Sequence, residues 1–201
     1  MNYTAAVAIA TVAFGFGAQA GQLTVSDRTV IVHINNEHFA MPAAALAKAR
    51  ASEMFSNIGI RLVWHSGRRQ SLPQDAIIVD IAYDASSNEC AGALACAKPY
   101  EGTHIQLFYC RIRTAVPNQV LPSLLAHVLV HEISHILQGV SRHSETGIMK
   151  AHWDAADLAQ MTSKALPFAQ EDTALIQRGL MARDSRSILA PPAGIASLGG
   201  L

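Results

Sequence analysis

The sequence predicts an α+β fold, chiefly from the order of its secondary-structure patterns. Four strand patterns fall within the first 111 residues with one helical segment among them, and three helical segments follow. Half of the 201 residues are hydrophobic and 15% are charged, a composition too apolar for a disordered chain. This length suits one domain with a substantial hydrophobic core.

Four segments predict the strands. Residues 29–34 alternate apolar and polar side chains, and residues 60–64 form a second short strand pattern. Residues 76–82 are more continuously apolar, which indicates a central strand. Residues 103–111 alternate again, so we expect a strand with one exposed side at a sheet edge, preceded by a long loop over residues 84–102.

A helix is expected between the first two strands. Residues 43–57 are rich in helix formers, Pro42 suits a first helical turn, and Gly59 suits the helix end. We expect its apolar face to consist of Leu46, Ala49, Met54 and Phe55.

A second helix is expected to carry the most distinctive residues of the chain. It begins between Asn118 and Ser123, because Pro122 is tolerated only near a helix start. It continues to about Gln138, where Gly139 provides a C-terminal cap.

Two more helices and a tail complete the prediction. Asp154 is a suitable N-cap for a helix over residues 155–164, Pro167 interrupts the pattern, and residues 169–183 predict the last helix. Residues 184–201 are rich in Ser, Pro, Gly and Ala, so we expect a flexible C-terminal tail.

The N-terminal segment predicts export. Residues 1–20 are almost all apolar or small, and Ala18-Gln19-Ala20 has the form of a signal peptidase site. We expect a signal peptide cleaved after Ala20, a catalytic domain over residues 21–183, and a secreted or periplasmic protein without membrane contact in its mature form. The segment lacks Lys and Arg, which leaves an uncleaved anchor or a misassigned start codon as alternatives.

The three cysteines are compatible with one disulfide. Cys90, Cys96 and Cys110 form no CxxC pair, which argues against a structural zinc site of that type. An exported protein could pair two of them and leave one thiol. All three pairings remain open, and so does the alternative of three reduced thiols.

Residues 131–135, which read HEISH, are the most informative motif of the chain. Residues four apart lie on one face of a helix, so His131 and His135 can bind one metal ion. Zinc needs a third protein ligand to leave one position open, and His143 beyond Gly139 offers it. The alternatives for the third ligand are Glu145, His152 and Asp154.

Two neighbouring residues could support this site. His127 lies one turn before the motif, and we expect it on the helix surface, with a place in the cleft or behind a ligand as the alternative. Met149 is interpreted as part of a tight turn just after His143, with an ordinary core position as the alternative.

These motifs resemble those of the metzincin metallopeptidases, whose signature HExxHxxGxxH is followed by a turn that carries a methionine. This chain has HExxH at 131–135, Gly139, His143 and then Gly147-Ile148-Met149. The resemblance covers about residues 28–165 and is specific only at 131–149. It differs by two extra residues before His143 and by Ala151, where many metzincins have tyrosine.

The resemblance implies a fold and an activity. The implied fold is a twisted mixed sheet with an antiparallel edge strand that pairs with substrate, an active-site helix, a Met-turn and C-terminal helices. The implied activity is that of a zinc endopeptidase in which Zn²⁺ activates water and Glu132 acts as the general base. We expect a monomer that acts on peptide or protein substrates.

Two other functions remain open. One is a metzincin-like protein of weak or no activity that binds peptide or zinc, which the stretched spacing and the missing tyrosine favour. The other is a three-histidine zinc endoribonuclease, against which Glu132 and the signal peptide argue. The zero formal net charge also gives no reason to expect a nucleic-acid partner.

Overall fold

The structure is a computed structural model, and it describes residues 28–35, 42–67, 72–83 and 90–189. The predicted signal peptide, residues 1–20, lies outside the described residues, as do residues 190–201. Among the helices of the described part, none combines the length and the apolar character that a membrane crossing requires.

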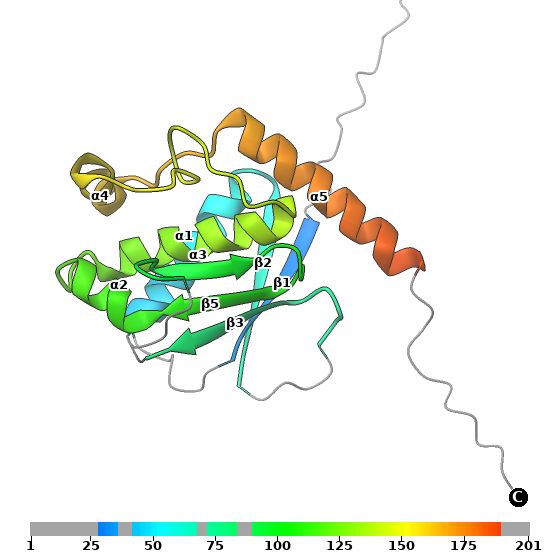
Figure 1. Cartoon of the computed structure of the whole chain (residues 1–201), viewed down its shortest axis with the longest axis horizontal. Helices are drawn as coiled ribbons and strands as arrows, with labels where there is room; N and C mark the ends of the chain where they lie inside the picture. Colours follow the sequence, from blue (N-terminus) through cyan, green and yellow to red (C-terminus); the bar gives the residue numbers. More distant parts are fainter. Residues whose placement is uncertain (1–27, 36–41, 68–71, 84–89, 190–201) are drawn as a thin grey trace, which may run out of the picture.

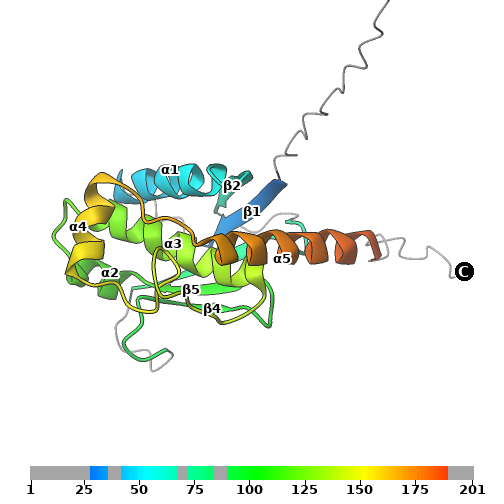
Figure 2. The same ribbon diagram turned by 90° about the horizontal axis from the view of Figure 1, so that it is seen from above.

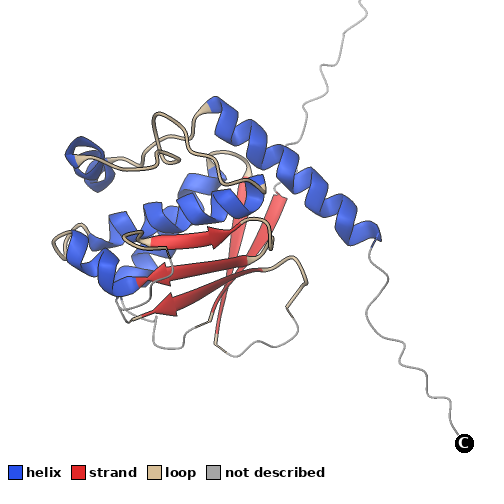
Figure 3. Cartoon of the chain, in the orientation of Figure 1, coloured by secondary structure: helices blue, strands red, loops and turns tan. Residues whose placement is uncertain are grey.

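A five-stranded mixed sheet forms one layer of the protein (Figures 1 and 3), with the order β2-β1-β3-β5-β4. Strands β1, β2, β3 and β5 run parallel, and β4 runs antiparallel to β5. The bounds are Arg28–Ile34 for β1, Ile60–Ser66 for β2, Ile77–Ala82 for β3, Ala95–Lys98 for β4 and His104–Phe108 for β5. The predicted α+β class is confirmed, and β3 is central as its apolar sequence predicted.

The antiparallel edge strand exists, but our assignment of it was wrong. Residues 103–111 were expected at the edge, whereas β5 pairs with a strand on both sides and the edge strand is β4, inside the expected loop 84–102. Strand β5 also ends at Phe108, because the short helix α2 (Tyr109–Ala115) begins there. The four residues of β4, Ala-Cys-Ala-Lys, are too few to give a period-two signal, so only pairing with β5 defines them.

Helices α1 (Pro42–Ser56) and α3 (Leu121–Gln138) pack side by side on one face of the sheet (Figures 1 and 2). Every residue of α3 except Pro122 is buried, which is typical of a helix enclosed by other elements. The predicted end of α3 is confirmed, since Gly139 caps it in the left-handed conformation with φ of 70°.

The apolar face predicted for α1 is partly wrong. Met54 and Phe55 are buried as expected, but Leu46 is 55% exposed and Ala49 is also exposed. The buried face consists of Ala44, Ala47, Ala51, Met54 and Phe55. The small alanines allow α1 to lie close to α3, so the contact with α3 rather than side-chain size decides which side of α1 is buried.

Two further helices, α4 (Ala155–Ser163) and α5 (Gln170–Leu189), follow α3 in the chain. Asp154 caps α4 as predicted, by accepting hydrogen bonds from two main-chain amides of the first turn. Helix α5 crosses the end of α3 (Figures 1 and 2) and continues past the predicted end at Arg183. The predicted tail is therefore wrong up to Leu189. Arg183 is buried and donates to the Gly102 carbonyl at 2.8 Å, which holds α5 at the turn between β4 and β5.

Candidate metal centre

Helix α3 presents the three polar residues of the HExxH motif to one cleft. His131, Glu132 and His135 are only 8%, 8% and 5% exposed. They lie in the second half of a helix whose other residues are mostly aliphatic and buried. Polar groups are costly to bury without partners, so their surroundings show what the site can do.

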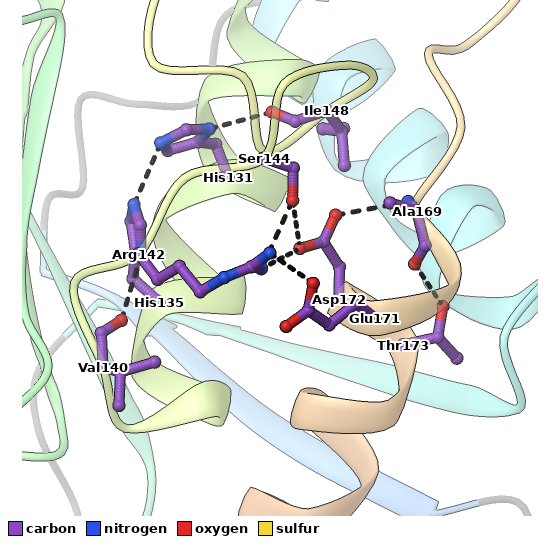
Figure 4. Close-up of polar contacts among 10 residues, drawn as sticks. All are labelled: His131, His135, Val140, Arg142, Ser144, Ile148, Ala169, Glu171, Asp172 and Thr173. Atoms are coloured by element: carbon purple, nitrogen blue, oxygen red, sulfur yellow. Dashed lines mark hydrogen bonds and ion pairs between the residues drawn. The ribbon is translucent and has the colours of Figure 1, made fainter.

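Both histidines of α3 are oriented by main-chain carbonyls (Figure 4). His131 Nδ1 lies 2.8 Å from the Ile148 carbonyl oxygen, and His135 Nδ1 lies 3.2 Å from that of Val140. A carbonyl only accepts, so each Nδ1 carries the proton and donates. Each Nε2 is therefore left with a lone pair, which is the form of imidazole that binds metals.

The two Nε2 atoms face each other at 3.0 Å. Two lone pairs at this distance repel each other unless a cation lies between them. In tetrahedral coordination, zinc–nitrogen bonds of about 2.0–2.1 Å place two nitrogens about 3.3 Å apart. The pair of histidines therefore fits a zinc ion with little adjustment.

His143 completes the cluster from the loop after α3. Its ring lies 5.3 Å from that of His131 and 5.0 Å from that of His135, measured between centroids. One possible ligand atom from each histidine falls within 4.8 Å of the others, so among the described residues these three could together hold a metal ion. The structure thus brings together the three predicted ligands, despite the two extra residues before His143.

The alternative third ligands have other roles or positions. Asp154 is the N-cap of α4 and pairs with Lys150 at 2.8 Å. Glu145 is exposed and is not part of the cluster. His152 lines the same cleft and lies near enough to His143 to lower the pKa of that ring, in addition to the larger effect of burial.

The predicted Met-turn forms directly beside the cluster. Gly147 has φ of +78°, and a Cβ there would lie 2.2 Å from the Pro167 carbonyl oxygen, so only glycine fits. The same oxygen accepts the Ile148 amide hydrogen at 2.9 Å, and Met149 is fully buried. The turn thereby places the Ile148 carbonyl where it orients His131.

His127 is not on the helix surface, so that expectation was wrong. It is 1% exposed; its Nδ1 lies 2.7 Å from the Ser123 carbonyl, and its Nε2 accepts the Leu166 amide hydrogen at 3.1 Å. Burial lowers its pKa, which agrees with a neutral ring that has one donor and one acceptor. His127 therefore fastens the chain just before Pro167, the residue that supports the Met-turn.

Glu132 points to the edge strand. Burial raises the pKa of Glu132 to about 7, and a hydrogen bond from the Ala97 amide opposes that rise. Burial likewise lowers the pKa of His131 to about 4 and of His135 to about 3, so both rings are neutral at pH 7. The site therefore offers neutral nitrogen ligands beside a carboxyl group that lies against β4.

A cleft of about 670 Å³ contains all four predicted site residues. One wall is residues 90–97, which include β4 and the disulfide between Cys90 and Cys96. The opposite wall is formed by residues 150–153 after the Met-turn, including Trp153, whose ring meets that of His131 edge to face at 5.5 Å. The pairing of the cysteines, left open by the sequence, is thus resolved, and Cys110 is the free thiol.

The described residues thus combine a mixed α+β fold with three histidines that meet in one cleft. The structure is similar to the crystal structure of archaemetzincin from Methanopyrus kandleri, with a TM-score of 0.53 over 78% of this chain and 97% of that one. The two sequences are 14% identical over the match, so this likeness concerns the fold. No protein-family model and no curated protein matches the sequence.

The sequence analysis missed three features of this site. Strand β4 had no clear periodicity, and the carboxylate of Asp172 approaches the His143 loop from a helix nearly thirty residues further along the chain. Trp153 packs against the hydrophobic core and also lines the cleft, where its ring meets that of His131. Its position shortly after Gly147-Ile148-Met149 was the one available signal, because this turn directs the next few residues back to the histidines.

Proposed function

We propose that this protein is an exported zinc-dependent endopeptidase, in which His131, His135 and His143 bind Zn²⁺ and Glu132 is the general base. One observation carries the proposal: three imidazoles converge in a cleft that also holds a buried glutamate. The archaemetzincin-like fold supports the same general kind of protein.

The cluster fits zinc better than most other divalent ions. Three neutral imidazoles suit zinc, whereas calcium and magnesium require oxygen ligands. The two carbonyl partners fix the tautomer and the orientation of the helix ligands, as is usual for metal-bound histidines. When bound, zinc would supply a Lewis acid that activates water and polarises the scissile carbonyl.

We assign Glu132 to proton transfer rather than to metal binding. It follows His131 in the helix, and its carboxylate reaches the Ala97 amide of β4 rather than the cluster of ring nitrogens. In this position it would accept the proton of the attacking water and deliver it to the leaving amine. The side chain is 8% exposed and lines the cleft, so its carboxylate is largely removed from bulk solvent while it faces the site.

The outer edge of β4 suits an extended peptide. The Phe108 amide donates to the Leu94 carbonyl, so Leu94 and Phe108 form a hydrogen-bonded pair. In an antiparallel ladder such pairs alternate with pairs that are not hydrogen-bonded. The main-chain groups of Ala95 and Ala97 therefore point away from β5. These groups face the cleft that holds the histidines. A substrate strand could add to this edge by β-augmentation, with its scissile bond beside Glu132.

Two features support the proposed export. Residues 1–20 have the composition of a signal peptide, and the chain forms a disulfide between Cys90 and Cys96. Disulfides persist mainly in oxidising compartments such as the periplasm and the extracellular space.

The test is Glu132→Gln, which keeps the shape of the side chain but removes the base. We expect the variant to bind zinc as tightly as wild type and to cleave casein at least about 100-fold more slowly, the usual contribution of a general base. Glu145→Gln, at an exposed carboxylate outside the cluster, is the matched control and should cleave normally.

Three results would contradict the proposal. Cleavage by Glu132→Gln at the wild-type rate would exclude the assigned role. A wild-type protein that binds zinc without turning over any peptide of a diverse library would favour a peptide- or zinc-binding protein. Degradation of RNA but not of casein, with both offered in parallel, would favour the endoribonuclease.

A further inference from the structure

The third ligand lies in a loop that cannot orient it unaided. His131 and His135 are fixed by α3, whereas His143 is exposed and follows the helix end at Gly139. Near it, one isolated bridge joins Ser144 to Lys150, and the Ser144 amide donates to the Met149 carbonyl at 2.8 Å. A ligand that must be ordered when the metal binds lowers affinity by the entropy of ordering.

Both chain neighbours of His143 bind the same carboxylate (Figure 4). Ser144 Oγ donates to Asp172 Oδ1 at 2.6 Å, and Arg142 Nη1 donates to the same oxygen at 3.2 Å. Arg142 Nη1 also lies 3.4 Å from Ser144 Oγ, which closes the triangle. The residues on both sides of His143 are therefore attached to the same carboxylate oxygen, Oδ1 of Asp172.

Asp172 is itself firmly placed. Its side chain is 0% exposed and belongs to the first turn of α5. Its other oxygen, Oδ2, accepts the amide hydrogen of Ala169, the residue just before α5, at 3.2 Å. A carboxylate is stabilised at a helix N-terminus by the amide groups there. The adjacent Glu171 also pairs with Arg142, but its side chain is 63% exposed.

Helix α5 is in turn docked on the helix that carries the other two ligands. Gly179 of α5 lies so close to α3 that a Cβ there would be 1.7 Å from the Leu137 carbonyl oxygen. The buried side chains Ile176 and Leu180 flank this contact. Asp172 therefore holds the His143 loop in a fixed position relative to α3.

We propose that Asp172 is a positioning residue for the metal site: by binding Arg142 and Ser144, it keeps the His143 ring aimed at the two histidines of α3. This inference rests on the proposed function, because it takes His143 as a zinc ligand. It also explains how a loop with two extra residues still brings its histidine to the cluster.

The experiment measures zinc affinity by competition with a chromophoric chelator, using the full chain and no peptidase assay. We expect Asp172→Asn to bind zinc about 10- to 100-fold more weakly, the usual loss when a group that orients a ligand is removed. Ser144→Ala removes a single hydrogen bond to the carboxylate and should weaken binding several-fold. Glu171→Gln is the matched control and should stay within about three-fold of wild type, because its ion pair is exposed.

A double-mutant cycle with His143→Ala separates positioning from a direct effect of the Asp172 charge. If Asp172 acts through His143, then Asp172→Asn weakens zinc binding in wild type but not in the His143→Ala background. If the carboxylate acts on the cation through space, the loss persists in both backgrounds. The absorption spectrum of the Co²⁺-loaded protein gives a second measure, since a misplaced ring changes the coordination geometry.

The outcomes distinguish this inference from the proposed function. Wild-type affinity in Asp172→Asn, or an equal loss in the His143→Ala background, overturns the positioning role while the zinc site stands. Should Asp172→Asn fail to fold by circular dichroism, unchanged affinity in Ser144→Ala overturns the inference instead. Absence of zinc binding by the wild-type protein would refute the proposed function and this inference together.

Discussion

Replacing Gly179 by alanine should have two opposing effects on the stability of the protein, one from helix propensity and one from packing of α5 on α3. In an isolated helix this change stabilises by about 1 kcal/mol, because alanine is the better helix former. In the protein, the added Cβ would lie 1.7 Å from the Leu137 carbonyl oxygen and 2.9 Å from the carbonyl carbon. A carbon and an oxygen rest about 3.3 Å apart, so α5 must move roughly 1.5 Å away from α3.

The displacement has a cost that the structure allows us to estimate. The obstacle is main chain, which cannot rotate aside as a side chain could, and overpacking of this kind costs about 1–3 kcal/mol or more. Ile176 and Leu180, 0% and 5% exposed, would lose part of their packing as well. After the helix-propensity gain of about 1 kcal/mol is subtracted, we expect a net destabilisation of about 1–2 kcal/mol.

Urea unfolding followed by circular dichroism, with the metal chelated, measures this free energy. Ser185→Ala, at an exposed position of the same helix, is the control and should change stability by less than about 0.5 kcal/mol. Because α5 carries Asp172, the Gly179 variant should also bind zinc more weakly. A Gly179→Ala protein as stable as wild type, or more stable, would refute the close docking of α5 on α3.

Two further predictions concern stability at low pH and the rim of the cleft. Burial lowers the pKa of His127 below its ordinary value of 6.5, so the unfolded chain takes up a proton that the folded protein does not. The contribution of His127 to stability should therefore be constant above pH 6.5 and fall as the pH drops below it, so urea unfolding of His127→Gln should show a smaller loss of stability with falling pH, by up to about 1.4 kcal/mol per pH unit. A pH dependence identical to wild type would contradict the neutral role of this ring. Reduction of the Cys90–Cys96 disulfide, or Cys90→Ser with Cys96→Ser, should raise the KM for peptide several-fold with a smaller change in kcat, because this loop forms one cleft wall. The Cys110→Ser variant is the control, and equal KM values in all three proteins would show that the disulfide does not shape substrate binding.

Most long elements followed from local patterns. Helix α3 is eighteen residues long and has a proline near its start and a glycine after its end, so its bounds were predictable. The spacing of His131 and His135 likewise fixed their common face, because helix geometry is local. The sequence patterns could not place β4, whose four residues become a strand only through pairing with β5.

The histidines show the same division within the site. His127 follows the same four-residue spacing as His131 and His135, so the sequence alone could not tell whether it lies on the surface or belongs with them. Its neighbours decide its role. The Leu166 amide donates a hydrogen bond to the Nε2 atom of His127, whereas the Nε2 atoms of His131 and His135 face each other.

By itself, the sequence determined which residues of α3 share a face, where that helix ends, and that an HExxH motif lies on it. These properties depend on the backbone geometry of a few consecutive residues. Only the tertiary structure decided that His143 reaches the other two histidines, that β4 borders the cleft, and that Asp172 binds the residues on either side of His143. Those facts depend on contacts between segments far apart in the chain, whose distances no local pattern encodes.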